Sequence, residues 1–99
     1  MNEGGFVDYV EKGPVSKKVL DLNRARQSLI EELGAIMWYD ERADATSDGV
    51  LREVLAHNRD DEKEHATLLI EWLRRNDPKF AKKIKEIILK SKKMSDLWD

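Results

Sequence analysis

In two long stretches of this 99-residue chain, residues that are predominantly apolar recur at alternating intervals of three and four positions. Such spacing is typical of helices that bury one stripe of side chains against other helices. The two stripes are called the seams below. The first seam consists of Leu22, Ala25, Leu29, Glu32, Ile36, Tyr39 and Ala43, and the second of Leu51, Leu55, Asn58, Glu62, His65, Leu69 and Trp72. They predict an all-α protein in which both seams face inward.

Caps and chain breakers divide the chain into three expected helices. The first begins at about Ser16, a plausible N-cap, and ends at about Ala45. Asp48 is expected to cap the second helix, which ends at about Arg75. Asp77 is expected to cap a third, shorter helix, because the proline that follows it fits the first helical turn.

The connection between the two long helices is short, at residues 46–49. A connection of that length predicts an antiparallel helical hairpin. Residues 1–15 contain several glycines and a proline, so we expect a flexible N-terminal arm there. The remaining residues, 16–99, are expected to form one helical-hairpin domain that ends in the shorter helix.

Three polar residues lie in the middle of the seams: Glu32 in the first, and Glu62 and His65 in the second. A charge at a core position costs several kcal/mol unless it is paired or binds a cation. Four-helix carboxylate proteins bind two metal ions with one Glu from each of two helices and a Glu-x-x-His from each of the other two. This chain carries each part once, so two chains would supply the complete set.

The donor types favour iron or manganese, since carboxylate oxygens with one imidazole per metal suit these ions. A metalloprotease is excluded, because the helix lacks the His-Glu-x-x-His motif. An alternative needs no metal: Glu62 and His65 form a helical ion pair, and Glu32 pairs with Arg59 or with an arginine of a second chain. Buried polar residues of that kind set the register of helical assemblies.

Charge and composition narrow the choice of partners. Residues 79–93 carry seven lysines and a single acid, Glu86. A solvated amphipathic helix accounts for this segment, and a contact with nucleic acid or membrane is the alternative reading. The chain has no cysteine, which excludes disulfides, and no apolar run long enough for a membrane span. It also lacks a signal-peptide pattern, so we expect a cytoplasmic protein that binds neither nucleic acid nor membrane.

Residues 28–81 resemble the encapsulated ferritins, a branch of the ferritin-like superfamily that is packaged inside encapsulin shells. The resemblance rests on the pairs Glu31–Glu32 and Trp38–Tyr39 and on the run AHNRDDEKEHA at residues 56–66. It implies a two-helix hairpin that dimerises into a ferritin-like four-helix bundle, with the dimers assembled into an annular decamer. The chain ends in KKMSDLWD, in which no shell-targeting peptide is recognised.

The resemblance also implies roles for individual residues. The ferroxidase ligands of the family match Glu32, Glu62 and His65 from each of two subunits, and Tyr39 lies beside the centre. Two more residues, Glu31 and Trp38, match the metal access route. Where the family has a second carboxylate on that route, this chain has Gly34, so the outer site is expected to be weak.

The expected function is a ferroxidase that oxidises Fe(II) to Fe(III) at a di-iron centre between two subunits. It would deliver iron for storage inside an encapsulin nanocompartment in the cytoplasm. A non-catalytic helical oligomerisation module with a polar, register-setting seam is the alternative. A third reading is an adaptor that uses the lysines of residues 79–93 as its contact.

Overall fold

The computed structural model describes residues 14–98. Their regular secondary structure is entirely helical, as predicted. Two long helices, α1 (Lys17–Ala45) and α2 (Gly49–Asn76), precede the shorter α3 (Pro78–Ile87). One turn of 3₁₀-helix, η1 (Met94–Asp96), follows near the end of the chain. Within the described range, each helix is too short or too polar to cross a lipid bilayer.

The predicted arm lies mostly in residues 1–13, which are outside the described residues. The three predicted N-caps are confirmed. The side chains of Ser16, Asp48 and Asp77 each accept hydrogen bonds from backbone N–H groups in the first turn of the helix that follows. Such bonds satisfy donors that a helix cannot satisfy internally. The predicted boundaries differ from the observed ones by about one residue, since α2 already includes Gly49 and ends at Asn76.

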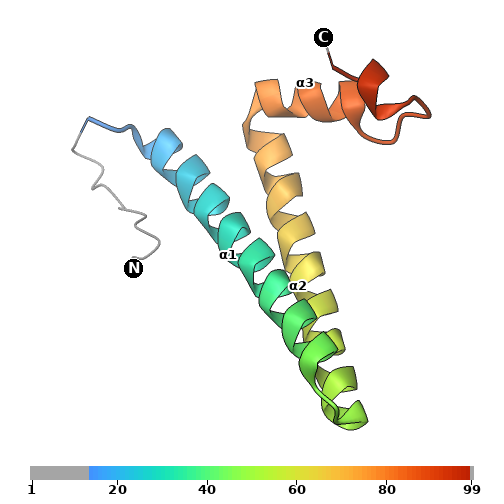
Figure 1. The fold of residues 1–99 in the computed structure, drawn as a ribbon. Helices are drawn as coiled ribbons and strands as arrows, with labels where there is room; N and C mark the ends of the chain where they lie inside the picture. Colours follow the sequence, from blue (N-terminus) through green and yellow to red (C-terminus); the bar gives the residue numbers. More distant parts are fainter. Residues whose placement is uncertain (1–13, 99) are drawn as a thin grey trace.

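The helices α1 and α2 lie antiparallel, side by side (Figure 1). Residues 46–48 connect them, and Arg52 fastens this connection. Its Nε donates to the carbonyl oxygen of Ala43 at 3.0 Å, and its Nη2 donates to the carbonyl oxygen of Thr46. Arg52 of α2 therefore satisfies carbonyl groups at the C-terminal end of α1 and holds the turn closed.

The core of the described chain is a narrow line between α1 and α2. Its buried apolar residues are Leu20, Ala43, Ala66 and Leu73. Of the fourteen seam residues, only Ala43 is buried, and Leu51, His65 and Trp72 are exposed. The seams are therefore only partly covered within one chain, and the prediction that both face the inside of a four-helix bundle stays a prediction. Two helices touch along one line only, so stripes suited to a four-helix bundle stay partly open.

The third helix turns sharply away from the end of α2 that lies opposite the loop, and it projects on the side away from α1 (Figure 1). Asp77 holds this junction. One of its oxygens caps α3, and the other accepts a hydrogen bond from Arg26 of α1 at 3.1 Å. None of the residues of α3 is buried.

Replacing Asp48 by alanine should lower the free energy of unfolding by about 1 kcal/mol, because two first-turn N–H groups of α2 lose their acceptor. Asp48→Asn keeps an acceptor oxygen and should retain most of the stability. Urea denaturation at one fixed protein concentration measures both variants. Equal stability of Asp48→Ala and the wild type would show that the cap contributes nothing.

Replacing Gly34 by alanine should raise the free energy of unfolding by about 1 kcal/mol, the difference in helix propensity between the two residues. A Cβ atom added at Gly34 meets nothing within 4 Å. The matched control is Ala35→Gly, which should lower stability by a similar amount. A lower stability of Gly34→Ala would contradict the prediction and would point to close approach by a second chain.

Candidate metal centre

Three side chains converge in the middle of the hairpin, Glu32 from α1 and Glu62 and His65 from α2. The Nδ1 atom of His65 lies 2.8 Å from Glu32 Oε2 and 3.1 Å from Glu62 Oε1. One ligand atom from each residue can be chosen so that all three lie within 4.8 Å of one another. The structure thus brings together the three residues that the sequence predicts as metal ligands.

Helix geometry explains the convergence. Glu62 and His65 are three residues apart, so they project from adjacent turns of one face of α2. Glu32 reaches the same point from α1. The exposed fraction of the side chain is 52% for His65, against 23% for Glu32 and 19% for Glu62. The group therefore lies at the open edge of the hairpin, within reach of another chain.

The charges around His65 change its protonation. Desolvation of the imidazole lowers its pKa, but the hydrogen bond and negative charge of Glu32, together with those of Glu62, raise it by more. The net result is a pKa of His65 above its ordinary value of 6.5. The Nδ1 atom of His65 therefore lies between two carboxylates that both favour the protonated form of the imidazole.

The donor set fits iron or manganese, since it combines hard carboxylate oxygens with one imidazole nitrogen. One chain supplies one Glu and one Glu-x-x-His pair, which is half of the ligand set of a four-helix di-metal site. The open edge at His65 is the side from which a second chain could supply the other half. The residues present thus fit half of a di-iron centre.

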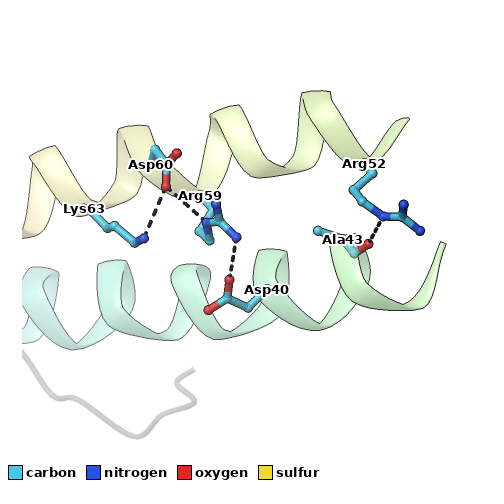
Figure 2. A network of polar contacts seen from close by, with 6 residues as sticks. All are labelled: Asp40, Ala43, Arg52, Arg59, Asp60 and Lys63. Carbon is cyan, nitrogen blue, oxygen red and sulfur yellow. Dashed lines mark hydrogen bonds and ion pairs between the residues drawn. The ribbon is translucent and has the colours of Figure 1, made fainter. Parts of the chain in front are cut away.

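Arg59 does not pair with Glu32, so that part of the metal-free alternative is wrong within one chain. Figure 2 shows the contacts that it makes instead. Its Nη1 donates to Asp40 of α1 at 2.9 Å and its Nε to Asp60 at 3.1 Å, while Lys63 also pairs with Asp60. Sequence reasoning missed this network, because nothing in the chain marks Asp40 and Arg59, nineteen residues apart, as neighbours.

The other predicted site residues lie outside the ligand group. Tyr39 is half-buried on α1, two turns beyond Glu32. Within residues 14–98, no hydrogen bond joins Tyr39 to the three ligands. Its role in the site stays a prediction.

Glu31 and Trp38 line a surface depression of about 400 Å³ on α1. Gly34, which lies between them in the sequence, also lines this depression. Glu31 accepts a hydrogen bond from Gln27 at 3.2 Å, and the guanidinium of Arg42 lies 5.6 Å from the ring centroid of Trp38. Glu31 is not among the converging ligands. The space beside Gly34 is open, and the weak outer site stays a prediction.

Comparison with known proteins places the chain in a family. The profile of the family described as EncFtn-like matches residues 8–91. The chain belongs to the EncFtn-like family. The predicted resemblance to the encapsulated ferritins is thereby confirmed.

Two relatives illustrate this membership of the EncFtn-like family. The encapsulated ferritin-like protein of Rhodospirillum rubrum is 49% identical over 71 residues, which are 72% of this chain and 51% of that protein. An encapsulin nanocompartment cargo protein of Myxococcus xanthus is 37% identical over 79 residues, 77% of this chain and 61% of that protein. The chain thus spans roughly half to three fifths of the length of these relatives.

A solved structure supports the fold. The crystal structure of a protein from Nitrosomonas europaea superposes with a TM-score of 0.82 at 42% sequence identity. The match covers 92% of this chain and 98% of that one. The long hairpin with a shorter third helix is therefore also the arrangement of a solved protein.

The His65 resonances of the metal-free protein should titrate with a pKa above 6.5, and Glu32→Gln should lower that pKa, because one of the two negative partners is lost. NMR of the imidazole across pH measures both. Since the neutral imidazole is the form that binds metal, metal affinity should increase as pH rises through this pKa. An unchanged pKa in Glu32→Gln would show that Glu32 is not the partner that charges His65.

Proposed function

We propose that this protein is a ferroxidase, which oxidises Fe(II) to Fe(III) at a di-iron centre formed between two subunits. We further propose that it delivers the iron for storage inside an encapsulin shell. The convergence of Glu32, Glu62 and His65 at an open edge is the observation that carries the proposal. A second copy, related by a two-fold axis through this edge, would bring four Glu and two His together.

The side chains have distinct tasks in this mechanism. Glu32 and Glu62 attract Fe(II), and as hard anionic ligands they stabilise the Fe(III) product more than the Fe(II) substrate. Two Fe(II) ions supply two electrons, enough to reduce dioxygen to hydrogen peroxide or peroxide to water. His65 must lose its proton before its nitrogen can bind, and its exposure leaves that proton a path to solvent.

Family membership supports the second half of the proposal. One relative is an encapsulin cargo protein, and another is an encapsulated ferritin-like protein. An annular decamer, which the family resemblance implies, encloses no mineral cavity of its own. A surrounding shell would then be the store, and this chain would supply it with oxidised iron. We propose an encapsulin nanocompartment in the cytoplasm as its location.

One observation favours the non-catalytic alternative. Nδ1 of His65 lies 2.8 Å from Glu32 and 3.1 Å from Glu62, so the three side chains can satisfy one another without any ion. Such a polar group in an otherwise apolar interface would fix the register of two hairpins. This module would assemble normally and would accelerate no iron chemistry.

An iron-oxidation assay distinguishes the ferroxidase from the non-catalytic, register-setting module. Purified, metal-free protein is loaded with Fe(II) without oxygen and exposed to air while the ferric absorbance is followed. Glu62→Ala should lower the oxidation rate by about tenfold or more, since even the loss of an outer-shell partner costs a metal site that much. The matched control is Glu64→Ala, which removes an exposed carboxylate of the same helix and should keep the wild-type rate.

If the wild type and Glu62→Ala both oxidised iron only at the background rate, the ferroxidase proposal would be refuted. If Glu62→Ala then also changed the mass of the assembly, the register-setting module would be supported.

Titration with Co(II), followed by its visible absorbance, gives a readout that does not depend on turnover. It should detect binding in the wild type and a loss of binding in Glu62→Ala.

A further inference from the structure

One guanidinium group bonds carboxylates on both long helices (Figure 2). The Nη1 atom of Arg59 donates to Asp40 of α1 at 2.9 Å, while its Nε donates to Asp60 of α2 at 3.1 Å. In each helix, these residues lie between the metal ligands and the loop. Arg59 therefore ties α2 to α1 beside the ligand group, and the proposed mechanism gives this contact no task.

The guanidinium of Arg59 is held in place on its own helix. Asp60 accepts its Nε–H bond and also pairs with the Nζ atom of Lys63 at 3.2 Å. Hydrogen bonds from Arg59 and Lys63 keep the pKa of Asp60 below its ordinary value, so the cluster stays charged at neutral pH. Ion pairs at a protein surface add little stability. What the planar fork of an arginine does supply is a defined geometry.

Apolar packing near the ligands specifies the register between α1 and α2 only weakly. Two of the buried residues, Leu20 and Leu73, lie near the end opposite the loop, whereas the other two are Ala43 and Ala66. Helices interlock through ridges of side chains that fit into grooves, and the methyl group of an alanine makes a low ridge. A polar contact can fix the register of helices in such a place. The bond from Arg59 to α1 is a contact of this kind.

The ligand group depends on the same register. Glu32 belongs to α1 and His65 to α2, so the 2.8 Å between them is a distance across the two helices. Arg59 lies three residues before Glu62, which is about 4.5 Å along the helix axis. A slide of α1 along α2 that broke the Arg59 contact would therefore also carry Glu32 away from His65. Functional side chains have to stay within about 0.5 Å of their productive geometry.

We infer that Arg59 is a positioning residue of the proposed metal centre. By holding Asp40, it fixes the register at which the carboxylate of Glu32 meets the two ligands of α2. It touches neither metal nor substrate in this role, since it acts through the relative placement of the two helices. The inference rests on the proposed function, because it takes the converging side chains to bind a metal ion.

Titration of the purified, metal-free protein with Co(II) measures the effect on the site. Arg59→Ala should lower the affinity for Co(II) about ten- to a hundredfold, as the loss of an outer-shell partner does at other metal sites. At saturating Co(II), the visible spectrum should also change in shape, because the ligands meet the ion in a different arrangement. A role in overall stability alone would leave the spectrum of the saturated protein unchanged. Circular dichroism checks that each variant is folded.

Asp40 supplies the other side of a double-mutant cycle. Asp40→Ala should weaken Co(II) binding as Arg59→Ala does, and the combined variant should bind no more weakly than either, because all three lose the same contact. Asp40→Asn changes an exposed residue, keeps its shape and leaves Arg59 a neutral acceptor, so it decides the question if Arg59→Ala does not fold. It should lower the affinity by a smaller factor.

The matched control is Arg74→Ala. This change removes an arginine of α2 that bonds Glu71 of the same helix. It should keep the wild-type affinity and spectrum, since no register between helices depends on a bond within one helix.

A distance between two spin labels reads the register without any metal. The chain has no cysteine, so Ser28→Cys on α1 and Glu64→Cys on α2, both at exposed positions, can each carry one label. Labelled protein is diluted with unlabelled protein, so that the measured distance lies within one chain. Arg59→Ala should shift or broaden the distance distribution of this labelled chain, and Arg74→Ala should leave it unchanged.

Wild-type affinity and spectrum in both Arg59→Ala and Asp40→Ala would overturn the inference. Losses that add up in the combined variant, or a label distance that Arg59→Ala leaves unchanged, would also overturn it. If the wild type itself bound no Co(II), the metal centre and the proposed function would fail, while the label distance would still test the register. The two failures are therefore distinguishable.

Discussion

Two helices can bury only the line along which they touch, and this limit governs the whole molecule. The described chain has four buried apolar residues, all along that line. Every other apolar stripe of the described residues stays partly exposed to water, including both seams and the face of α3. At about 25 cal/mol per Å² of apolar surface, these stripes are a large unused source of association energy. The proposed second copy would cover part of this exposed apolar surface.

The position of the ligand group follows from the same limit. In the dry centre of a bundle, two carboxylates and an imidazole would be costly without a cation. At the edge of a hairpin, water still solvates His65, and its Nδ1 atom lies within 3.1 Å of both carboxylates. The same side chains would thus be stable in two settings, in a lone hairpin and at the proposed metal centre between two copies. The proton on His65 and the metal ion compete for the same position.

Local chemistry was enough to predict the helices and the convergence of three polar side chains. Ser16, Asp48 and Asp77 mark helix starts because a cap depends only on the few residues around it. Glu32, Glu62 and His65 were found because their period places them on the seams. The exposure of the seams was not predictable from the period, which is the same for a hairpin and a bundle. The pairing of Arg59 with Asp40 depends on the register between α1 and α2. Local sequence patterns do not predict that register.

The short connection at residues 46–48 has a consequence for the order of events. Most contacts between α1 and α2 can form by zipping outward from this turn, and chains with such local contacts fold within microseconds to milliseconds. Arg52 secures the turn from residues only a few positions away. The hairpin can therefore fold on its own chain soon after synthesis, at a rate independent of concentration. The proposed joining of two half-sites would be bimolecular, so its rate would depend on how much protein the cell has made.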